Sequence, residues 1–226
     1  MGDELFIALS GARAATRQME ATANNAANSA TTGFKASRVA FELVDGELAG
    51  TGSVVAEQSD GVLVDDGNPL HIGLQGPAWM TVQVGDEQLL TRDGTFHLEG
   101  GTVVTQAGHA VLTDSGPLTL EPGDELQITA KGGVLVNDEE RGNLLLKSAS
   151  AVEPIGGNLY RGMDLTDPDM GRVSVKQGAL EQSNADPVRT MTSLIEASRY
   201  FEAMQKLLRA SDEMSQRGNQ SAGGSR

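Results

Sequence analysis

Three histidines are the side chains of this sequence best suited to acid–base chemistry or metal binding near neutral pH. His71, His97 and His109 fall in separate β-like runs, and no two of them have the spacing of a zinc site. The sequence contains no cysteine, which excludes thiolate metal sites, disulfides and a cysteine nucleophile. We therefore expect each histidine to have a structural or surface role, and we predict no metal site.

Carboxylates and serines could also supply a site, but their spacing does not match one. The run Asp164–Asp169 resembles a calcium loop, yet Val175 stands where the twelfth position requires glutamate. Lys131 lacks the glycine cradle of a phosphate loop, and the sequence contains no Gly-x-Ser-x-Gly pattern. We predict a solvated acidic loop, no catalytic residue and no cofactor. A hydrolase assembled from scattered serine, histidine and aspartate remains an alternative.

The formal net charge of -14 is concentrated in the middle of the chain. Residues 41–171 carry five basic and 22 acidic side chains, whereas the segments on either side are close to neutral. Because nucleic acids and anionic lipids are bound through lysines and arginines, this distribution argues against both as partners. The near-neutral ends could approach copies of themselves without strong repulsion.

An amphipathic helix is predicted near the N-terminus because small or apolar residues recur in alternating steps of three and four. The predicted seam consists of Leu5, Ala8, Ala12, Ala15, Met19, Thr22 and Ala26. Most of these residues are alanines, which bury little area each, so the helix needs a partner for stability. Turn-forming residues follow from Asn24 to Gly33.

A second amphipathic helix is predicted from Asp186, a favourable cap, and Pro187, a favourable first-turn residue, to about Gln216. Its seam consists of Met191, Leu194, Ala197, Phe201, Met204 and Leu208. Two seams at opposite ends of one chain predict that the helices pair with each other. Residues 218–226 are rich in glycine, serine and glutamine and are predicted to be disordered.

Between the helices, short apolar runs alternate with turn signals, which is typical of antiparallel β-structure. Asp93–Gly94, Gly100–Gly101 and Gly132–Gly133 are the predicted hairpin turns. The predicted fold class is α+β. Residues 1–36 and 182–226 form a discontinuous, coiled-coil-like helical domain, and residues 37–181 form an all-β domain inserted between them.

Targeting signals are not recognisable in the sequence. The acidic start Met1–Glu4 lacks the basic region of a signal peptide and does not fit a myristoylation motif. The apolar run Leu5–Leu9 is interrupted before it reaches signal length, and no stretch approaches the length of a membrane span. Taken alone, these features predict a cytoplasmic protein.

Four separated motifs resemble those of the flagellar rod and hook protein family. Asn24–Lys35 resembles the N-terminal signature of the family, and Gln177–Val188 resembles its closing segment. Asn68–Trp79 and Thr91–Phe96 match two short motifs of its β domain. The residues that carry the match are Asn24, Asn25, Asn28, Thr31, Thr32, Gly33, Phe34, Asn68, Pro69, Leu70, Gly76, Trp79, Arg92, Asp93, Gly94, Gly178, Leu180, Ser183 and Asn184.

Within the family, Gly76–Trp79 and Ser183–Pro187 are most similar to the proximal-rod, FlgF-type branch. The chain departs from the usual pattern at Ala26, His71 and Ala78, where leucine, aspartate and glycine are common. The alanine at position 26 gives the helical seam less apolar area than leucine would. The alanine at position 78 indicates a position that needs no positive φ.

The resemblance implies a non-enzymatic structural subunit of the flagellar basal-body rod, which assembles with copies of itself and with other rod subunits. It also implies export through the flagellar type III apparatus without a cleaved signal. The location implied by the resemblance is then the basal body in the cell envelope, in place of the cytoplasm. The terminal helices would form an inner layer of the rod and the β domain an outer one. The alternatives are a distal-rod or hook subunit, or a secreted β-rich hydrolase or carbohydrate-binding module.

Assembly is expected to order the ends of the chain. Alanine-rich helices bury enough area only when several pack together, so we predict that residues 1 to about 35 are largely disordered in the isolated monomer. We also predict that an aspartate in place of Leu194 or Phe201 blocks assembly and leaves the β domain folded.

Overall fold

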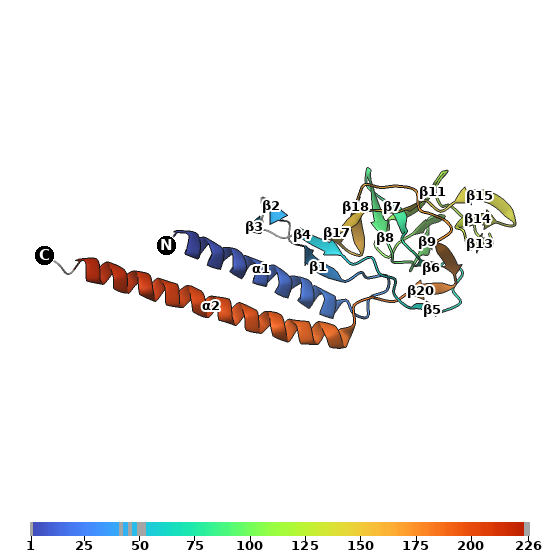
Figure 1. Cartoon of the computed structure of the whole chain (residues 1–226). Helices are drawn as coiled ribbons and strands as arrows, with labels where there is room; N and C mark the ends of the chain where they lie inside the picture. Colours follow the sequence, from blue (N-terminus) through green and yellow to red (C-terminus); the bar gives the residue numbers. More distant parts are fainter. Residues whose placement is uncertain (1, 41–42, 45–46, 49–52, 224–226) are drawn as a thin grey trace. The chain divides into compact units, whose positions relative to one another are not determined.

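The computed structural model describes residues 2–40, 43–44, 47–48 and 53–223 of the chain (Figure 1). The side chains of residues 2–9, 43–44, 47–48, 207–208 and 211–223 lie outside that description. The chain divides into two compact units. The helical unit comprises Met1–Ala26, Arg38–Val54 and Pro187–Arg226, and the β-rich unit comprises Ala27–Ser37 and Val55–Asp186.

The two long helices lie near the two ends of the chain. Helix α1 spans Gly2–Ala27 and helix α2 spans Pro187–Gly223 (Figure 1). After α1 the turn-forming run closes at Gly33, whose φ of +66° is a conformation that glycine adopts readily. Asp186 directly precedes α2, and Pro187 is its first residue, as the sequence predicted.

Helix α2 continues beyond its predicted end. We predicted a helix to about Gln216 and disorder from Gly218, but α2 ends at Gly223. Extending an existing helix by a few residues requires no new nucleation, so weak helix formers such as Gly218 and Asn219 can continue it. Residues 224–226 of the predicted tail lie outside the described residues.

Short strands follow α1 before the main β-structure begins. Strand β1 (Ser37–Ala40) pairs with β4 (Ser53–Ala56). Strand β2 (Leu43–Val44) pairs with β3 (Glu47–Leu48) in an antiparallel ladder. The chain therefore passes through two small ladders between α1 and the main body of the β-rich unit.

A nine-stranded antiparallel sheet dominates the β-rich unit (Figure 1). Its main path has the order β17-β18-β8-β7-β11-β10-β9, with β12 paired to β11 and β16 paired to β7. The strands are β7 (Trp79–Val84), β8 (Glu87–Thr91), β9 (His97–Glu99), β10 (Thr102–Val104), β11 (Ala110–Thr113), β12 (Gly116–Pro117), β16 (Leu146–Lys147), β17 (Ala151–Gly156) and β18 (Leu159–Met163). The predicted α+β class with antiparallel β-structure is confirmed.

Three smaller antiparallel ladders complete the unit. Strands β13 (Leu126–Ile128), β14 (Gly133–Val136) and β15 (Glu139–Asn143) form one of them. Strand β6 (Ile72–Gln75) pairs with β19 (Ser174–Gln177), and β5 (Leu63–Asp65) pairs with β20 (Ala179–Glu181). The last two ladders bring the motif around residue 70 next to the closing motif that precedes α2.

The main core of this unit forms where apolar faces of these ladders meet. In β14, Val134 and Val136 are buried while Leu135 is half-buried, which is the two-residue period of a strand with one face inward. Ile72 and Leu74 of β6 are fully buried in the same cluster. Burial of such aliphatic side chains, each contributing about 1.5–3 kcal/mol, is the main source of stability here.

Two of the three predicted hairpin turns are present. Gly100 and Gly101 connect β9 to β10 with φ values of +56° and +85°, the positive values that a tight hairpin turn requires. Gly132 lies in the connection between β13 and β14 with a φ of +81°, and Gly133 is the first residue of β14. The hairpin predicted at Asp93–Gly94 is wrong, because β8 pairs with β7 and β18 and not with β9.

Gly94 instead allows two backbone segments to approach closely. The amide of Ile72 donates to the carbonyl of Gly94 over 3.2 Å. A Cβ atom at position 94 would lie only 1.7 Å from the carbonyl oxygen of Ile72. The glycine therefore permits close contact between the loop after β8 and the start of β6, a reason that local turn propensity does not reveal.

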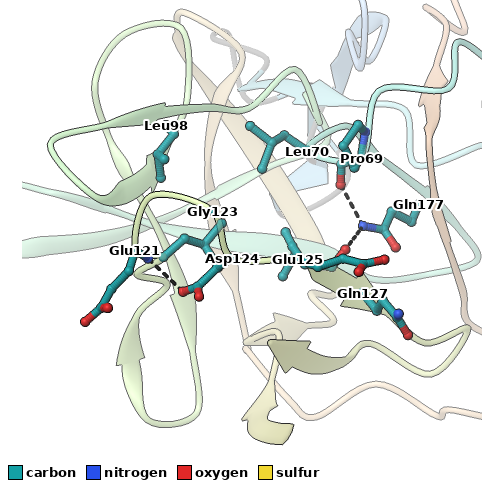
Figure 2. A pocket seen from close by; sticks show the side chains of 11 residues that line it. Pro69, Leu70, Leu98, Glu121, Gly123, Asp124, Glu125, Gln127 and Gln177 are labelled. Carbon is teal, nitrogen blue, oxygen red and sulfur yellow. Dashed lines mark hydrogen bonds between the residues drawn. The ribbon is translucent and has the colours of Figure 1, made fainter. Parts of the chain in front are cut away.

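Two surface features of the described residues complete the fold. Neither α1 nor α2 has, over its described length, the apolar stretch that crossing a membrane would require. A groove on the β-rich unit lies between Pro69–Leu70, Leu98 of β9 and the segment Leu120–Gln127 (Figure 2).

Candidate functional site: a buried ionic junction

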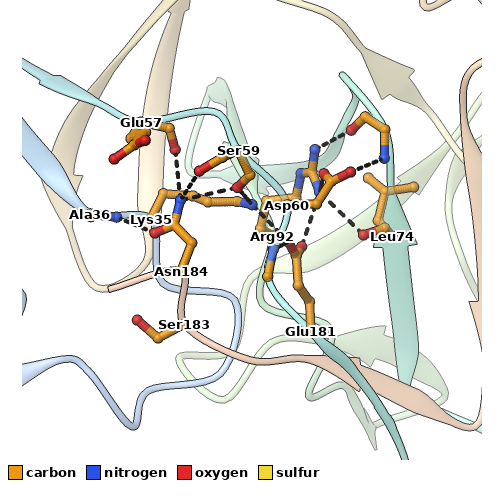
Figure 3. A network of polar contacts seen from close by, with 12 residues as sticks. Lys35, Ala36, Glu57, Ser59, Asp60, Leu74, Arg92, Glu181, Ser183 and Asn184 are labelled. Atoms are coloured by element: carbon orange, nitrogen blue, oxygen red, sulfur yellow. Dashed lines mark hydrogen bonds and ion pairs between the residues drawn. The ribbon is translucent and has the colours of Figure 1, made fainter. Parts of the chain in front are cut away.

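Segments that are distant in the sequence meet inside the β-rich unit at a place that we call the junction (Figure 3). It comprises residues 32–36, residues 57–61, residues 74–76 with Arg92, and residues 181–184. Gly33 makes the approach possible, because its φ is +66° and a Cβ atom there would lie 2.4 Å from the backbone of Arg92. Any other residue at position 33 would push the N-terminal segment away from this place.

Four charged side chains form the centre of the junction. The Lys35 Nζ atom lies 2.7 Å from Oε1 of Glu181, and Nη1 of Arg92 lies 2.9 Å from Oε2 of the same carboxylate. Asp60 adds a second carboxylate, 3.3 Å from Arg92. The side chains of Lys35, Glu181 and Arg92 are at most 1% exposed, whereas that of Asp60 is 33% exposed. Three members of the ionic network therefore lie in the interior, and the fourth reaches the surface.

Hydrogen bonds from the surroundings add to the coordination of these charges, although the buried Nε of Arg92 has no hydrogen-bond partner among the described residues. Lys35 also donates to the carbonyl of Ser59 over 2.6 Å, and the amide of Gly61 donates to Glu181 over 2.6 Å. Arg92 donates to the carbonyls of Leu74, at 3.2 Å, and of Gly76. A buried charge is tolerated only when it is paired and hydrogen-bonded in this way.

The backbone of residues 32–36 is bound almost residue by residue. The amide of Gly33 donates to the carbonyl of Glu181 over 2.7 Å, and the amide of Ala36 donates to Oδ1 of Asn184 over 2.6 Å. Asn184 in turn donates to the carbonyl of Ser59 over 3.0 Å. Because these partners come from residues 59–184, the N-terminal segment is held by groups far from it in the sequence.

Aromatic side chains shield one side of the network. The guanidinium carbon of Arg92 lies 5.3 Å from the ring centre of Trp79, within the range of a cation–π contact. Trp79 in turn packs against Tyr160, with ring centres 4.8 Å apart. The Tyr160 hydroxyl accepts a hydrogen bond of 3.0 Å from the amide of Lys35. The shielding excludes water and strengthens the ionic contacts behind it.

Burial changes the titration of two groups in the junction. Desolvation lowers the pKa of Lys35 below its usual 10.5, the charge of Arg92 lowers it further, and Glu181 opposes both. Desolvation also raises the pKa of Tyr160 from 10 to about 12. With its charges paired and its surface covered, the junction is suited to holding segments together and not to exchanging protons with a substrate.

Comparison with known proteins identifies the chain. Residues 5–35 match the family model described as flagella basal body rod protein, and residues 176–221 match the one described as flagellar basal body rod FlgEFG protein C-terminal. Flagellar basal-body rod protein FlgF of Mesorhizobium japonicum is 33% identical over 224 residues, which cover 92% of this chain and 93% of the relative. The chain belongs to the flagellar basal-body rod protein family.

Other rod proteins show the same breadth of similarity. FlgF of Salmonella typhimurium is 29% identical and covers 97% of this chain and 98% of its own length. FlgG of Bacillus subtilis is 28% identical and covers 94% and 96%. Membership of the rod family implies a place in the flagellar basal body among other rod components.

The rod-family motifs converge on the junction from both ends and from the middle of the chain. Gly33, Gly76, Arg92 and Asn184 all take part in the contacts given above. Phe34 packs with Ala36 and Ala185, and the side chain of Ser183 accepts from the amide of Ala185 over 3.1 Å. Trp79 lies against Arg92, and the carbonyl of Thr32 accepts from Asn158 over 2.9 Å.

A second group of rod-family motif residues meets away from the junction. Asn68 accepts a 3.0 Å hydrogen bond from the amide of Leu70, and the carbonyl of Pro69 accepts from Gln177 over 2.7 Å. The amide of Gly178 donates to the carbonyl of His71 over 2.8 Å. Leu180 is half-buried within β20. These contacts fix the start of β6 against the end of β19.

The remaining motif residues have local roles. Asn24 and Asn25 lie near the end of α1. Asn28 and Thr31 contact each other through their side chains at 3.2 Å in the turn that follows the helix. Asp93 accepts from the amide of Thr95 over 3.0 Å and so closes the loop before β9.

The predicted seam residues of the helices differ in exposure. Ala15 and Ala197 are buried, and the half-buried ones are Ala12, Met19, Leu194, Phe201 and Met204. Met191 is 62% exposed. The side chains of Leu5, Ala8 and Leu208 lie outside the described residues. A Cβ atom at Gly11 of α1 would lie 3.6 Å from the sulfur of Met204 of α2, so these two positions are close.

The other side chains considered for chemistry differ in their contacts, and Nδ1 of His97 is buried without a hydrogen-bond partner among the described residues. His71 hydrogen-bonds to Asp66, which lowers the pKa of that exposed carboxyl below its usual value. Asp167 of the acidic run lies 2.8 Å from Lys147. The residues that the structure describes contain no cluster of three acidic or histidine side chains that could hold a metal ion.

Sequence reasoning missed the charged centre of the junction. Lys35 and Glu181 lie inside the quoted motifs but were not selected, and Asp60 and Tyr160 lie outside every motif. The available signal was the pair of opposite charges in the two terminal motifs, Lys35 at the end of the first and Glu181 in the second. These charges stand out because the terminal segments are nearly neutral in total. Asp60 and Tyr160 left no signal, because only the fold brings them to Lys35 and Arg92.

Proposed function

We propose that this chain is a structural subunit of the flagellar rod, at the proximal-rod position of the FlgF-type relatives, and that it carries motor torque as part of the axial shaft. The observation that carries the proposal is identity of 33% to an FlgF protein across more than nine-tenths of both chains. In this role the helical domain predicted from the sequence, residues 1–36 and 182–226, forms the axial layer. Residues 37–181 form the outer one.

Pairing of α1 with α2 as a coiled-coil-like layer is part of the proposal. It is supported by the burial of Ala15 and Ala197, one on each helix, and by the closeness of Gly11 to Met204. Small residues on both helices permit close backbone approach, although each buries little area. A pair of this kind gains most of its stability when neighbouring subunits pack against it.

The junction suits a load-bearing role. It binds residues 32–36, which follow α1, to residues 181–184, which precede α2. The chain segments that lead into the two helices are therefore tied to each other and to the β-rich unit by an interior network. Force applied to either helix would reach the same buried contacts.

We infer the route of export and the place in the envelope as part of the proposal, with membership of the rod family as their support. The subunit would leave the cell through the flagellar type III export apparatus without a cleaved signal and join the rod in the cell envelope, where it contacts other rod subunits and its own copies. Its ends are nearly neutral, so they can pack closely without the repulsion that the acidic middle would cause.

A distal-rod position is the second candidate. It is favoured by the 28% identity to FlgG of Bacillus subtilis, which also extends over most of both chains. Cross-linking in isolated basal bodies distinguishes the two positions. A proximal subunit contacts components at the base of the rod, whereas a distal one contacts the hook side.

Electron microscopy of basal bodies from a strain that lacks this chain tests the proposal. We expect basal bodies that stop before a complete rod, cells that do not swim, and recovery of both properties when the gene is restored. A complete rod and normal swimming in the deletion strain would refute the proposed function.

A further inference from the structure

The groove between Leu70, Leu98 and the segment Leu120–Gln127 has an apolar floor (Figure 2). Leu120 and Leu126 are buried in the core beneath it, whereas Leu98 remains 40% exposed on β9. Gln177 fixes the walls by donating to the carbonyls of Pro69 and Leu126, at 2.7 and 2.8 Å. The groove is therefore formed in the single chain and does not require a partner to open it.

The rim of the groove is acidic. Glu121, Asp124 and Glu125 line it, and among the described residues no lysine or arginine does so. Asp124 is used locally, since it accepts from the amide of Glu121 over 2.8 Å and from Asn137 over 2.6 Å. Within the described part of the chain none of these three carboxylates forms an ion pair. The charge of Arg141 acts on Asp124, which leaves Glu121 and Glu125 as the main negative charges of the rim. An apolar floor with such a rim fits an apolar side chain flanked by cations.

The start of α2 has the complementary chemistry. Val188, Met191 and Ile195 are 74%, 62% and 56% exposed and recur in steps of three and four, as the anchors of a helix docked in a groove do. Arg189 and Arg199 are exposed on the same stretch. The amino end of a helix also carries a partial positive charge. The first turns of α2 therefore combine apolar anchors with positive charge.

Other exposed apolar side chains of the described residues fit the groove less well. Val64 is followed by Asp65 and Asp66, and Leu165 follows Asp164. Their acidic neighbours would meet an acidic rim, and juxtaposed like charges oppose association. Exposed Glu196 follows Ile195, but residues 187–195 contain Arg189 and no acidic side chain. The first turns of α2 therefore suit the acidic rim better than the surfaces around Val64 and Leu165 do.

We propose that the groove receives the first turns of α2 from a second copy of this chain. The proposal rests on the proposed function, because it gives a specific surface to the assembly of rod subunits. Groove and helix face are different surfaces of one molecule, so the contact is heterologous and can repeat from copy to copy. Contacts of this kind generate helical tubes when the rotation does not close a ring.

Disulfide trapping between copies tests the contact directly, because the chain contains no cysteine of its own. Full-length Leu98→Cys and Met191→Cys are mixed and oxidised, so that a mixed adduct can only be intermolecular. We expect this adduct to form about tenfold faster than the one from the control pair Val62→Cys and Met191→Cys, since Val62 is 67% exposed but lies outside the groove. Equal rates for the two pairs would overturn the proposal.

Charge reversal tests the electrostatic part. Glu121→Lys with Glu125→Lys, added to the Leu98→Cys chain, should slow adduct formation about tenfold. Arg189→Glu with Arg199→Glu in the Met191→Cys chain should restore it, because the signs are then exchanged on both sides. A rate that the first change leaves unaltered, or that the second fails to restore, would contradict the assigned orientation.

Trapping in basal bodies separates this inference from the proposed function. A photo-crosslinking residue at position 98 should give an adduct with the mass of two copies of this chain. If the chain enters the rod but residue 98 cross-links only to a different rod protein, the groove assignment is overturned and the proposed function stands. Failure to enter the rod would count against the proposed function, and the disulfide experiment in solution would still decide the groove.

Discussion

At the scale of single residues, the junction depends on balanced charge. Two cations share one interior carboxylate, because Glu181 contacts both Lys35 and Arg92, and the partly exposed Asp60 adds a second carboxylate to Arg92. Such a network contributes little net stability compared with apolar packing, but the removal of one member leaves an unpaired charge in the interior. Its main effect is therefore to impose one arrangement on the segments that it joins.

Glu181→Gln tests this dependence. The amide keeps the shape of the side chain but leaves Lys35 and Arg92 with one buried carboxylate fewer, so we expect a loss of about 3–5 kcal/mol in the free energy of unfolding. Urea unfolding followed by the fluorescence of Trp79, the single tryptophan, measures it in the β-rich unit.

The matched control for this change is Asp167→Asn. It removes the carboxylate of the Lys147–Asp167 pair, in which Asp167 is 88% exposed. An exposed pair of this kind contributes little to stability, because water and salt screen it, so we expect the free energy of unfolding to be nearly unchanged. Similar losses in the two variants would show that the interior network has no special importance.

Tyr160 gives the stability of the chain a dependence on alkaline pH. The pKa of its phenol is about 12 in the folded state and 10 when unperturbed. Between these values the folded state binds more protons than the unfolded state, so stability falls as the pH rises through that window. The shift corresponds to roughly 2–3 kcal/mol by pH 12.

Comparison with Tyr160→Phe isolates this contribution. The lowered pKa of Lys35 makes stability rise with pH below 10.5, which is opposite to the effect of Tyr160. This contribution is present in both proteins and cancels in the comparison. The variant has no phenol to ionise. It also loses the hydrogen bond from the Lys35 amide, but the stability cost of that loss does not vary with pH through ionisation at position 160. We expect the stability advantage of the natural chain over the variant to shrink from pH 10 to 12. An advantage that stays constant over this range would contradict the assignment.

At the scale of elements, the N-terminal region has two parts with different means of support. Helix α1 presents an alanine-rich seam, which needs other helices to bury it. Residues 33–36, in contrast, are bound by side chains and backbone of the β-rich unit. The sequence predicted that residues 1 to about 35 become ordered only on assembly. We now limit this prediction to α1, because the last residues of that segment belong to the β-rich unit.

Amide hydrogen exchange on the isolated chain should separate the two parts. We expect the amides of Gly33, Lys35 and Ala36 to exchange as slowly as those of the nine-stranded sheet, because each donates to a partner inside the unit. The amides of α1 should exchange much faster. Slow exchange along the whole of α1 would show that the helix is stable without neighbouring subunits.

At the scale of the whole molecule, each of the two compact units has its own role: one provides stability and the other provides surfaces for assembly. The nine-stranded sheet and its ladders supply a large apolar core, and the helical unit supplies long seams with little apolar area of their own. Stability and assembly can therefore be changed separately by mutation. Damage to a seam should leave the β-rich unit folded.

Phe201→Asp tests this separation. The half-buried ring lies in the predicted seam of α2, and a buried carboxylate there would oppose helix packing. We expect the variant to abolish motility and to keep the β circular dichroism and the Trp79 fluorescence of the natural chain. Leu194→Asp should behave in the same way.

The control is Ala203→Asp, which adds the same charge on an exposed position of the same helix. It should swim and fold normally. Motility in the Phe201→Asp strain, or its loss in the Ala203→Asp strain, would show that the seam has been assigned to the wrong face.

The sequence by itself determined the elements that depend on local or periodic signals. Steps of three and four placed both helices, and glycine pairs placed the hairpins at residues 100–101 and 132–133. Motifs spread over the whole chain determined the family. These features could be predicted because each depends on residues that are neighbours in the chain.

Only the tertiary structure decided which motif residues work together. Lys35 and Glu181 are 146 positions apart, and nothing local requires them to share one buried site with Arg92 and Asp60. The same holds for Gly94, which suits a hairpin by sequence but serves close contact with Ile72. Contacts between distant segments depend on how complete ladders pack, and this information lies in the fold and not in any single stretch of residues.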